Sequence, residues 1–593
     1  MTLTTLDWSI IFAFFVISMA IGVLVSKQSG KSSSDFFLSG RSMPWWLLGF
    51  SMVATTFSAD TPNLVTDIVR KNGVSGNWVW WAFLLTGMLT VFVYARLWRR
   101  SGVMTDLEFY ELRYSGKGAA FLRGFRALYL GVFFNVLIMA TVTLAAIKIG
   151  GILLGLTPTQ TILIASIVTV FYSALGGLKG VILTDFFQFI IAMVGSVWAA
   201  YVVLNMPEVG GLTNLLEHEN VAGKLHLLPD FNNMEVLIPL FILPLAVQWW
   251  SVWYPGAEPG GGGYIAQRML SAKDEKNAVG ATLFFNIAHY ALRPWPWILI
   301  ALGSLVMFPD IASLKLAFPN VDPGIVNDDL AYPAMLTYLP AGLLGLVIAS
   351  LIAAFMSTIS THLNWGSSYI VNDFYKRFVD KDASEKKMVS VGRISTVILM
   401  ALAAILALYL SNALQAFNIL LQIGAGTGLI FILRWFWWRI NAYSEIAAMV
   451  ISFLVAIYFE FIHPVPVPDH WKLLMGVGIT TVGWLTVTFL TQPDDYSKLL
   501  SFYKLIRPHS RGWKPVIDRA LSENTITKKD ITVGKLPGEL AGMFSGVFLV
   551  YGSLFAIGFW IYGNIQGALI ATGVALVSGY FMKQLLDKKN REA

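Results

Sequence analysis

Long apolar stretches recur along the whole chain, separated by segments that carry charge, proline or glycine. A membrane core about 30 Å thick is crossed by a helix of roughly 20 apolar residues. Stretches of this length predict about fifteen membrane-spanning helices, and hence an all-α polytopic membrane protein. The spans are expected at residues 5–26, 44–70, 78–99, 124–156, 159–178, 181–204, 236–255, 277–307, 340–374, 388–411, 414–438, 442–461, 471–491, 540–562 and 564–586.

Charge alternates between successive loops of this arrangement. Loops that follow odd-numbered spans are basic, as at Lys386 and Lys387, whereas residues 205–235 and 308–339 are rich in Asp and Glu. Because basic loops stay in the cytoplasm, the pattern predicts a multi-pass plasma-membrane protein with its N-terminus outside and its C-terminus cytoplasmic. The first apolar stretch lacks a preceding basic residue and a small-residue cleavage signal, so we expect it to be a retained span.

Two predicted spans contain residues that interrupt a regular helix. In the second span, small and hydroxylated residues beginning at Ala54 precede Asp60 and Pro62, and proline frees a carbonyl upstream. The seventh ends in the proline- and glycine-rich stretch 254–263. Either feature could instead be a kink that only bends its span. Since the interruptions lie five spans apart, an odd number, they predict two five-helix units of opposite orientation in the bilayer.

The inverted-repeat interpretation divides the chain into six parts. One span precedes the two repeats and about four follow them. The parts are 1–43 with the extra N-terminal span and first inner loop, 44–204 with the first repeat, 236–438 with the second repeat, 442–491 with accessory spans, 492–538 as a cytoplasmic loop, and 539–593 with two further spans and a basic tail.

Composition narrows the classes of function. With 56% hydrophobic and 13% charged residues, the chain has no room for a separate soluble catalytic domain. The net charge of +7 follows from the basic inner loops, so we expect no nucleic-acid partner. The absence of cysteine excludes disulfides and thiolate chemistry. No histidine pair with metal spacing, nucleophile elbow or phosphate loop occurs, so we expect neither an enzyme nor an organic cofactor.

The ninth predicted span carries small and hydroxyl side chains at helical-neighbour spacing. One face holds Ala354, Ser357 and Thr358, and an adjoining face holds Ser357, Ser360 and Thr361. Such oxygens suit a small hard cation, and carbonyls freed at Ala54 and Phe57 would complete its shell. The hydroxyls could equally bond to their own helix or join neighbouring helices.

Two further polar residues stand in apolar surroundings. Asp185 lies near the start of a predicted span, where an acid is costly and usually functional, although it could instead cap the helix. Gln422 precedes a glycine-rich stretch of the eleventh span. It could contact a solute or form a hydrogen bond across helices.

Five segments of the chain resemble the sodium:solute symporter family, whose fold is LeuT-like. The family includes sodium/sugar, sodium/proline and sodium/sialic acid transporters. The similarity extends over about residues 5–460, and the segments are 35–46, 176–185, 266–273, 357–364 and 372–375. The resemblance implies sodium-coupled symport of a small polar solute by alternating access, with Na⁺ as the coupling ion. Alternatives are a sensor that signals through the C-terminal region and a sodium-independent carrier.

The resemblance also implies the residues of the ion sites. The first sodium would be held by the carbonyls of Ala54, Phe57 and Ala354 and the hydroxyls of Ser357 and Thr358. A second sodium is implied at Asp185, Ser360 and Thr361, with Ser357 shared between the two sites.

The solute-binding positions match the family less well. The candidates are Asp60, Thr61, Gln248, Gly262, Arg293 and Gln422. Sugar transporters carry Gln where this chain has Thr61 and Asn where it has Gly262, which puts a sugar in doubt. Arg293 stands where the family has a cavity lysine, and its fork suits a carboxylate. It could instead pair with Asp60 or Glu258. The expected partners are therefore the lipid bilayer and a sugar, amino acid or carboxylate.

Overall fold

The structure of the protein is a computed structural model. It describes residues 3–29, 31–251, 258–319, 321, 326–410, 426–459, 467–531 and 536–592. The described residues form helices and no strand, apart from an isolated bridge between Met43 and Ala272. The prediction of an all-α fold is therefore confirmed for this part of the chain.

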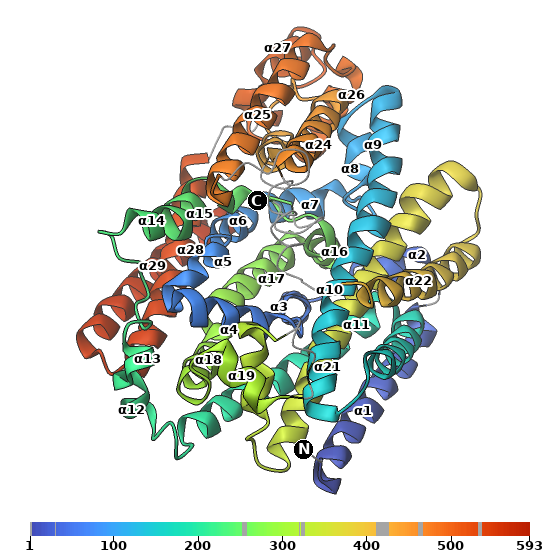
Figure 1. Cartoon of the computed structure of the whole chain (residues 1–593). Helices are drawn as coiled ribbons and strands as arrows, with labels where there is room; N and C mark the ends of the chain where they lie inside the picture. The colour runs from blue at the N-terminus through green and yellow to red at the C-terminus, as the bar shows by residue number, and fades with distance from the viewer. Residues whose placement is uncertain are drawn as a thin grey trace.

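The helices follow one another with short connections (Figure 1). The first half of the chain contains α1 (Thr5–Ser29), α2 (Ser33–Leu38), α3 (Trp45–Thr56), α4 (Thr61–Asn72), α5 (Trp78–Trp81), α6 (Leu84–Leu89), α7 (Ala95–Ser101), α8 (Glu108–Arg113), α9 (Gly116–Leu128), α10 (Asn135–Ile149), α11 (Pro158–Leu204), α12 (Leu212–Glu217), α13 (Glu219–Ala222), α14 (Met234–Leu237) and α15 (Leu243–Ala246). The second half contains α16 (Gly263–Ser271), α17 (Glu275–Ile287), α18 (Pro294–Met307), α19 (Ile311–Ala317), α20 (Ala331–Leu336), α21 (Leu343–Ser368), α22 (Glu385–Ala407), α24 (Ala442–Ile457), α25 (Asp469–Leu490), α26 (Tyr496–Ile506), α27 (Lys514–Ser522), α28 (Leu536–Ile561) and α29 (Ile565–Glu592).

Ten helical segments of the described chain are long and apolar enough to cross a membrane. Three shorter apolar helices accompany them, at Pro158–Phe171, Met234–Ala246 and Ala442–Ile457. This pattern agrees with a multi-pass membrane protein. The count of about fifteen spans and the division into two repeats remain predictions, since residues 411–425 lie outside the described part.

Two long helical segments are interrupted, and both interruptions have a local cause. Between α3 and α4, residues 57–60 leave the helical path, and the new helix begins at Thr61 with Pro62 in its first turn. The predicted break in the second span is therefore confirmed. In α11 the backbone of Gly177 adopts φ 54° and ψ −165°, so the element consists of two helices joined at this glycine. Only glycine visits this region readily.

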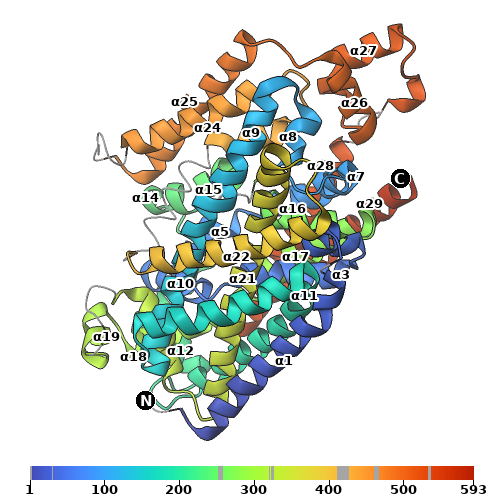
Figure 2. The same cartoon turned by 90° about the vertical axis from the view of Figure 1, so that its right-hand side faces the viewer.

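The broken helix lies in the interior of the bundle. Helix α3 packs against α11, α17 and α21, and α11 also packs along α1 (Figure 2). In the segment Leu343–Val379, which includes α21, 89% of the most apolar stretch is buried, against 28% for the N-terminal span and 22% for Ile565–Lys588. The polar residues of α21 are therefore enclosed by protein, whereas α1 and α29 present apolar side chains outward.

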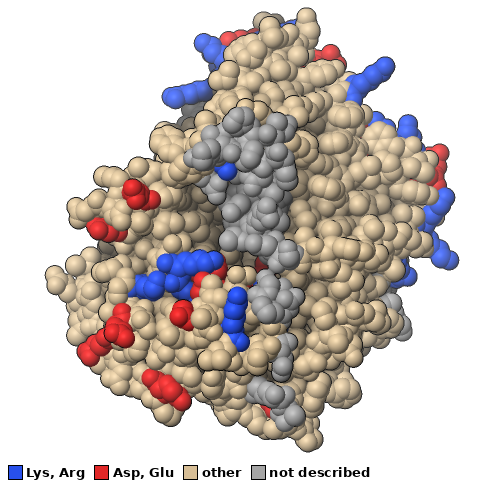
Figure 3. Space-filling view, viewed as in Figure 1, with Lys and Arg blue, Asp and Glu red and all other residues tan. Residues whose placement is uncertain are grey.

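The two ends of the molecule differ in structure and charge. Helices α12 and α19 lie at one end and α26 and α27 at the other, in both orientations (Figures 1 and 2). Most of the face in view is uncharged, and Lys and Arg lie near α26 and α27 and also, together with Asp and Glu, in a patch at mid-height left of centre (Figure 3). An apolar surface of this kind suits a lipid surrounding.

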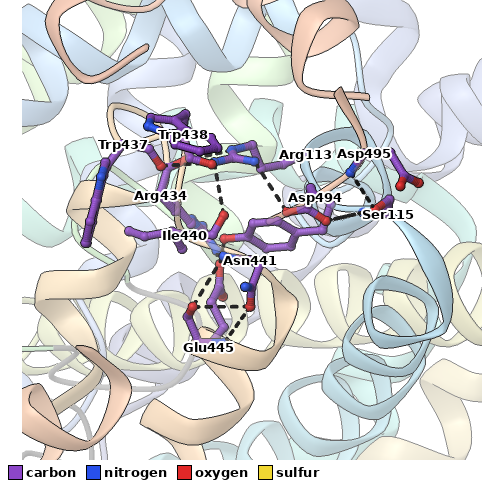
Figure 4. Close-up of polar contacts among 12 residues, drawn as sticks. Arg113, Ser115, Arg434, Trp437, Trp438, Ile440, Asn441, Glu445, Asp494 and Asp495 are labelled. Atoms are coloured by element: carbon purple, nitrogen blue, oxygen red, sulfur yellow. Dashed lines mark hydrogen bonds and ion pairs between the residues drawn. The ribbon is translucent and has the colours of Figure 1, made fainter. Parts of the chain in front are cut away.

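Residues 492–531 fold back onto the helices at the α26–α27 end. The Arg113 guanidinium lies 3.7 Å from the Asp494 carboxylate (Figure 4). It also lies 4.8 Å from the centre of the Trp513 ring. It also donates hydrogen bonds to the carbonyls of Arg434, Trp437, Trp438 and Ile440. The segment expected to be a cytoplasmic loop thus contains helices fixed to the bundle by a buried cation.

Candidate functional site

The unwound end of α3 meets the hydroxyl face of α21. Helix α3 ends where the amide of Phe57 donates to the carbonyls of Val53 (2.9 Å) and Ala54 (3.1 Å). The Thr358 hydroxyl donates to the carbonyl of Thr55 at 2.9 Å. A hydroxyl of α21 and a carbonyl at the end of α3 are therefore brought together, although this carbonyl belongs to Thr55 and not to the predicted Ala54 or Phe57.

The other two members of this predicted site lie on the same buried stretch of α21. Ala354 and Ser357 are 2% and 0% exposed, so neither faces lipid. The Ser357 hydroxyl donates to the Asp185 carboxylate at 2.7 Å. One serine thus links the first predicted ion site to the second.

Asp185 is enclosed within α11, past the kink at Gly177, and is fully buried. Its carboxylate also accepts a hydrogen bond from Ser51 of α3 at 2.5 Å. Because it lies inside a helix and its hydrogen bonds come from other helices, the alternative that Asp185 caps a helix is wrong. The acid instead joins α11 to α3 and α21.

Arg268 of α16, which is not among the predicted site residues, also belongs to this cluster. It is fully buried, its Nη2 lies 3.7 Å from the Asp185 carboxylate, and it donates to the Thr361 hydroxyl at 2.7 Å. The Ser360 hydroxyl instead donates to the Ser357 carbonyl of its own helix. The signal available in the sequence was the acid itself, since a buried carboxylate requires a partner of opposite charge.

The second predicted interruption is described only in part. Gln248 lies in a short 3-10 turn, η7 (Gln248–Trp250), and donates to the Val79 carbonyl at 2.8 Å. Gly262 precedes α16 as its N-cap. Residues 252–257, and the candidate Gln422, lie outside the described part of the chain.

Arg293 does not form either of the ion pairs considered from the sequence. Glu258 pairs instead with Arg126 and, at 3.0 Å, with Arg434, while the described residues include no ion pair between Arg293 and Asp60. Arg293 has uncharged neighbours. They are the Val53 carbonyl (3.4 Å), the Thr56 hydroxyl (3.1 Å), the His289 ring (Nε2, 3.4 Å) and the face of Trp297 (5.3 Å).

Asp60 and Thr61 lie at the start of α4, where the chain leaves the break. Asp60 is the N-cap residue, and the Thr61 hydroxyl accepts a hydrogen bond from the Ser58 amide at 3.3 Å. Together with Arg293, they place polar groups around the unwound segment. His289 was not predicted here, and it joins Thr56 to Arg293 through its two ring nitrogens.

The described residues contain no group of three or more His, Asp or Glu side chains arranged to hold a metal ion. The oxygens at α3 and α21 are hydroxyls and carbonyls, which suit a monovalent hard cation better than a transition metal.

Comparisons with known proteins identify the family of this chain. The model of the sodium:solute symporter family matches residues 36–452. A sodium/glucose cotransporter of Vibrio parahaemolyticus is 26% identical over 82% of this chain and 90% of its own length. A sodium/mannose cotransporter of Bos taurus is 26% identical over 79% of this chain and 81% of its own length.

Among solved structures, a Na⁺-coupled sialic acid symporter in a substrate-bound outward-open state superimposes with a TM-score of 0.66. It shares 20% identity and covers 83% of this chain and 99% of its own, so it supports the fold. The family match covers well over half of the sequence, including both α3 and α21. The chain therefore belongs to the sodium:solute symporter family.

Proposed function

We propose that this protein uses the sodium gradient to carry a small polar organic solute across the plasma membrane by alternating access. The sodium would be held by carbonyls of Ala54, Phe57 and Ala354 and by the hydroxyls of Ser357 and Thr358. Membership of the symporter family and the transporters among its relatives support this function over an enzyme.

The observation that carries the proposal is the hydrogen bond from Thr358 to the Thr55 carbonyl. It supports the proposal because it brings the hydroxyl face of α21 against the end of α3, where the helix gives way to the break. An ion bound there would join the two elements, and its departure would release them. That is the behaviour required of an ion that controls access to a solute site.

The energetics allow uptake against a gradient. Each positive charge that moves inward gains about 2.3 kcal/mol per 100 mV, equivalent to roughly fiftyfold accumulation of solute. Coupling is reciprocal, so a sodium ion that raises the affinity for solute must have its own affinity raised by the same factor. We further propose that the α26–α27 end and the C-terminus are cytoplasmic and the N-terminus external, as the basic loops indicate.

A second sodium at Asp185, Ser360 and Thr361 is a separate part of the proposal. Arg268 already places its positive charge beside Asp185 and donates to Thr361. A second ion would therefore have to displace this guanidinium.

Replacing Thr358 by Val tests the first site, because it removes one oxygen while keeping the shape. The assay is uptake of a mixture of labelled sugars, amino acids and carboxylates into proteoliposomes, with a sodium or a potassium gradient. We expect uptake by the natural protein to need sodium. Thr358→Val should require at least tenfold more sodium for half-maximal uptake, which corresponds to a loss of about 1.4 kcal/mol in the free energy of sodium binding.

Thr486→Val is the matched control. The Thr486 hydroxyl is exposed on α25 and donates only to the Val482 carbonyl of its own helix, so we expect its sodium dependence to be unchanged. Uptake indifferent to sodium would refute the proposed coupling. Absence of uptake, with signalling by the C-terminal region, would favour the sensor alternative.

A further inference from the structure

Beside the predicted sodium site, the structure holds two groups of opposite charge that do not pair with each other. Asp60 begins α4, and Arg293 follows the π-helical turn η8 (Ala288–Leu292). Both lie at the break between α3 and α4, because Arg293 contacts Val53 and Thr56 at the end of α3 and Asp60 precedes α4. No ion pair joins them among the described residues, so neither charge neutralises the other.

Arg293 is enclosed without a carboxylate among the described residues. Its side chain is 2% exposed, and its partners there are a carbonyl, a hydroxyl and an imidazole. The buried Nε atom has no hydrogen-bond partner in the described part of the chain. The guanidinium thus keeps a donor available, and an enclosed cation of this kind favours an anionic group supplied by a ligand.

Asp60 presents the complementary group. The buried Oδ1 atom of its carboxylate has no hydrogen-bond partner among the described residues. Asp60 stands at the break itself, where the backbone has no regular winding. A carboxylate accepts hydrogen bonds and attracts a cation, so this atom suits an ammonium group.

Neighbouring rings keep the two charges in place. Trp297 lies under the Arg293 guanidinium and stacks on Phe57, with ring centres 5.1 Å apart. His289 contacts both Thr56 and Arg293, and Trp80 packs edge-on against the His289 ring. These contacts orient Arg293 without neutralising it, which leaves its charge for a solute.

We infer that the solute is a zwitterion of the α-amino acid type, with its carboxylate on Arg293 and its ammonium group on Asp60. This inference rests on the proposed function and specifies its substrate. A neutral sugar would leave both charges unpaired, and a simple carboxylate would leave Asp60 unpaired and repelled. Groups left unpaired in an enclosed site discriminate strongly against the wrong ligand.

Four mixtures, used in turn at the same total concentration, distinguish these ligands. They are neutral L-α-amino acids, the corresponding carboxylates without the amino group, the corresponding amines without the carboxylate, and hexoses. Each is tested by sodium-driven uptake into proteoliposomes and by its effect on the Tm of the purified protein in sodium and in potassium. We expect only the amino acids to be taken up and to raise the Tm, and to do so only in sodium.

Variants then test the two charges separately. We expect Arg293→Met to lower the apparent affinity for the amino acids at least a hundredfold and Asp60→Asn at least tenfold. Arg293→Lys, which keeps the charge and loses the fork, should retain part of the affinity. Arg100→Met is the control, since Arg100 pairs with Glu275 away from the break, and we expect unchanged uptake. A Tm that still rises with sodium alone shows that a variant is folded.

The outcomes separate this inference from the proposed function. Sodium-driven uptake of hexoses or of simple carboxylates, or amino-acid uptake unaffected by Arg293→Met and Asp60→Asn, would overturn the zwitterion while leaving sodium symport intact. If no mixture is taken up in response to sodium and sodium leaves the Tm unchanged, the proposed function itself is overturned.

Discussion

Two buried charged residues within the bundle, Asp185 and Arg293, differ in the partners that the protein provides for them. Asp185 accepts hydrogen bonds from Ser51 and Ser357 and forms an ion pair with Arg268, so three other helices contact its carboxylate. Its cluster is complete within the protein, as expected of a group that holds helices together. Arg293 has uncharged partners and an unused donor in the described structure. The first arrangement stabilises the fold, whereas the second favours a ligand.

Removal of Arg268 should therefore be costly. In Arg268→Met the Asp185 carboxylate loses its charged partner, and we expect the free energy of unfolding to fall by roughly 3–5 kcal/mol. The measurement is the Tm of the purified protein in detergent.

The double variant Arg268→Met with Asp185→Asn tests whether the unpaired charge of Asp185 causes the loss of stability in Arg268→Met. It removes both charges, so its Tm should lie above that of Arg268→Met alone. A double variant less stable than Arg268→Met would show that the loss has another origin, such as the hydrogen bond to Thr361.

At the scale of elements, the kink at Gly177 divides α11 into two helices. Residues before and after Gly177 are helical, whereas this glycine has a positive φ. The second part then carries Asp185 to α3 and α21. A side chain at position 177 would oppose the turn by steric strain between its Cβ and the backbone.

Gly177→Ala should consequently destabilise the protein by about 1–3 kcal/mol. Gly180→Ala is the matched control on the same element, because Gly180 is helical and an added Cβ there meets open space. We expect the control to be neutral or more stable by up to about 1 kcal/mol, since alanine favours the helix. Thermal unfolding of both variants measures the difference, and equal Tm values would show that the kink does not depend on glycine.

At the scale of the whole molecule, a buried network at the α26–α27 end joins distant parts of the chain. Glu258, beside the second interruption, pairs with Arg126 of α9 and with Arg434, and Arg434 also lies 3.4 Å from Glu445 of α24. Nearby, Asp106 accepts hydrogen bonds from the Gly263 amide (2.9 Å) and from the Tyr369 hydroxyl. A passage opening at this end would have to rearrange these contacts.

Asp106 makes this end sensitive to pH. Burial, together with the negative charge of Glu258, raises the pKa of Asp106 from 3.8 to about 6. The folded protein then binds this proton more tightly than the unfolded chain, so the contribution to stability is complete below about pH 4 and is lost as the pH rises through about 6. We expect Asp106→Asn to reduce the fall in Tm between pH 4 and 6.

The exposed residue Asp230 offers a control for this measurement. Asp230→Asn should leave the dependence of Tm on pH unchanged. A pH profile of Asp106→Asn identical to that of the natural protein would show that Asp106 does not titrate in this range.

The sequence by itself determined the helical fold, the membrane location and the break near Pro62. These depend on local properties, namely runs of apolar residues as long as a membrane is thick and a proline that cannot continue a helix. The hydroxyl face of α21 could likewise be predicted, since helical spacing fixes which side chains share a face.

Only the tertiary structure decided which partners these residues have. Arg268 lies beside Asp185, and Arg293 remains apart from Asp60 and Glu258, because α3, α11, α16 and α21 pack together over long sequence separations. The hydrophobic pattern of a sequence predicts which residues are buried, but it does not predict which buried charged residues contact one another. That choice depends on the distance and direction of a few atoms across helix contacts, and only the packed bundle fixes both.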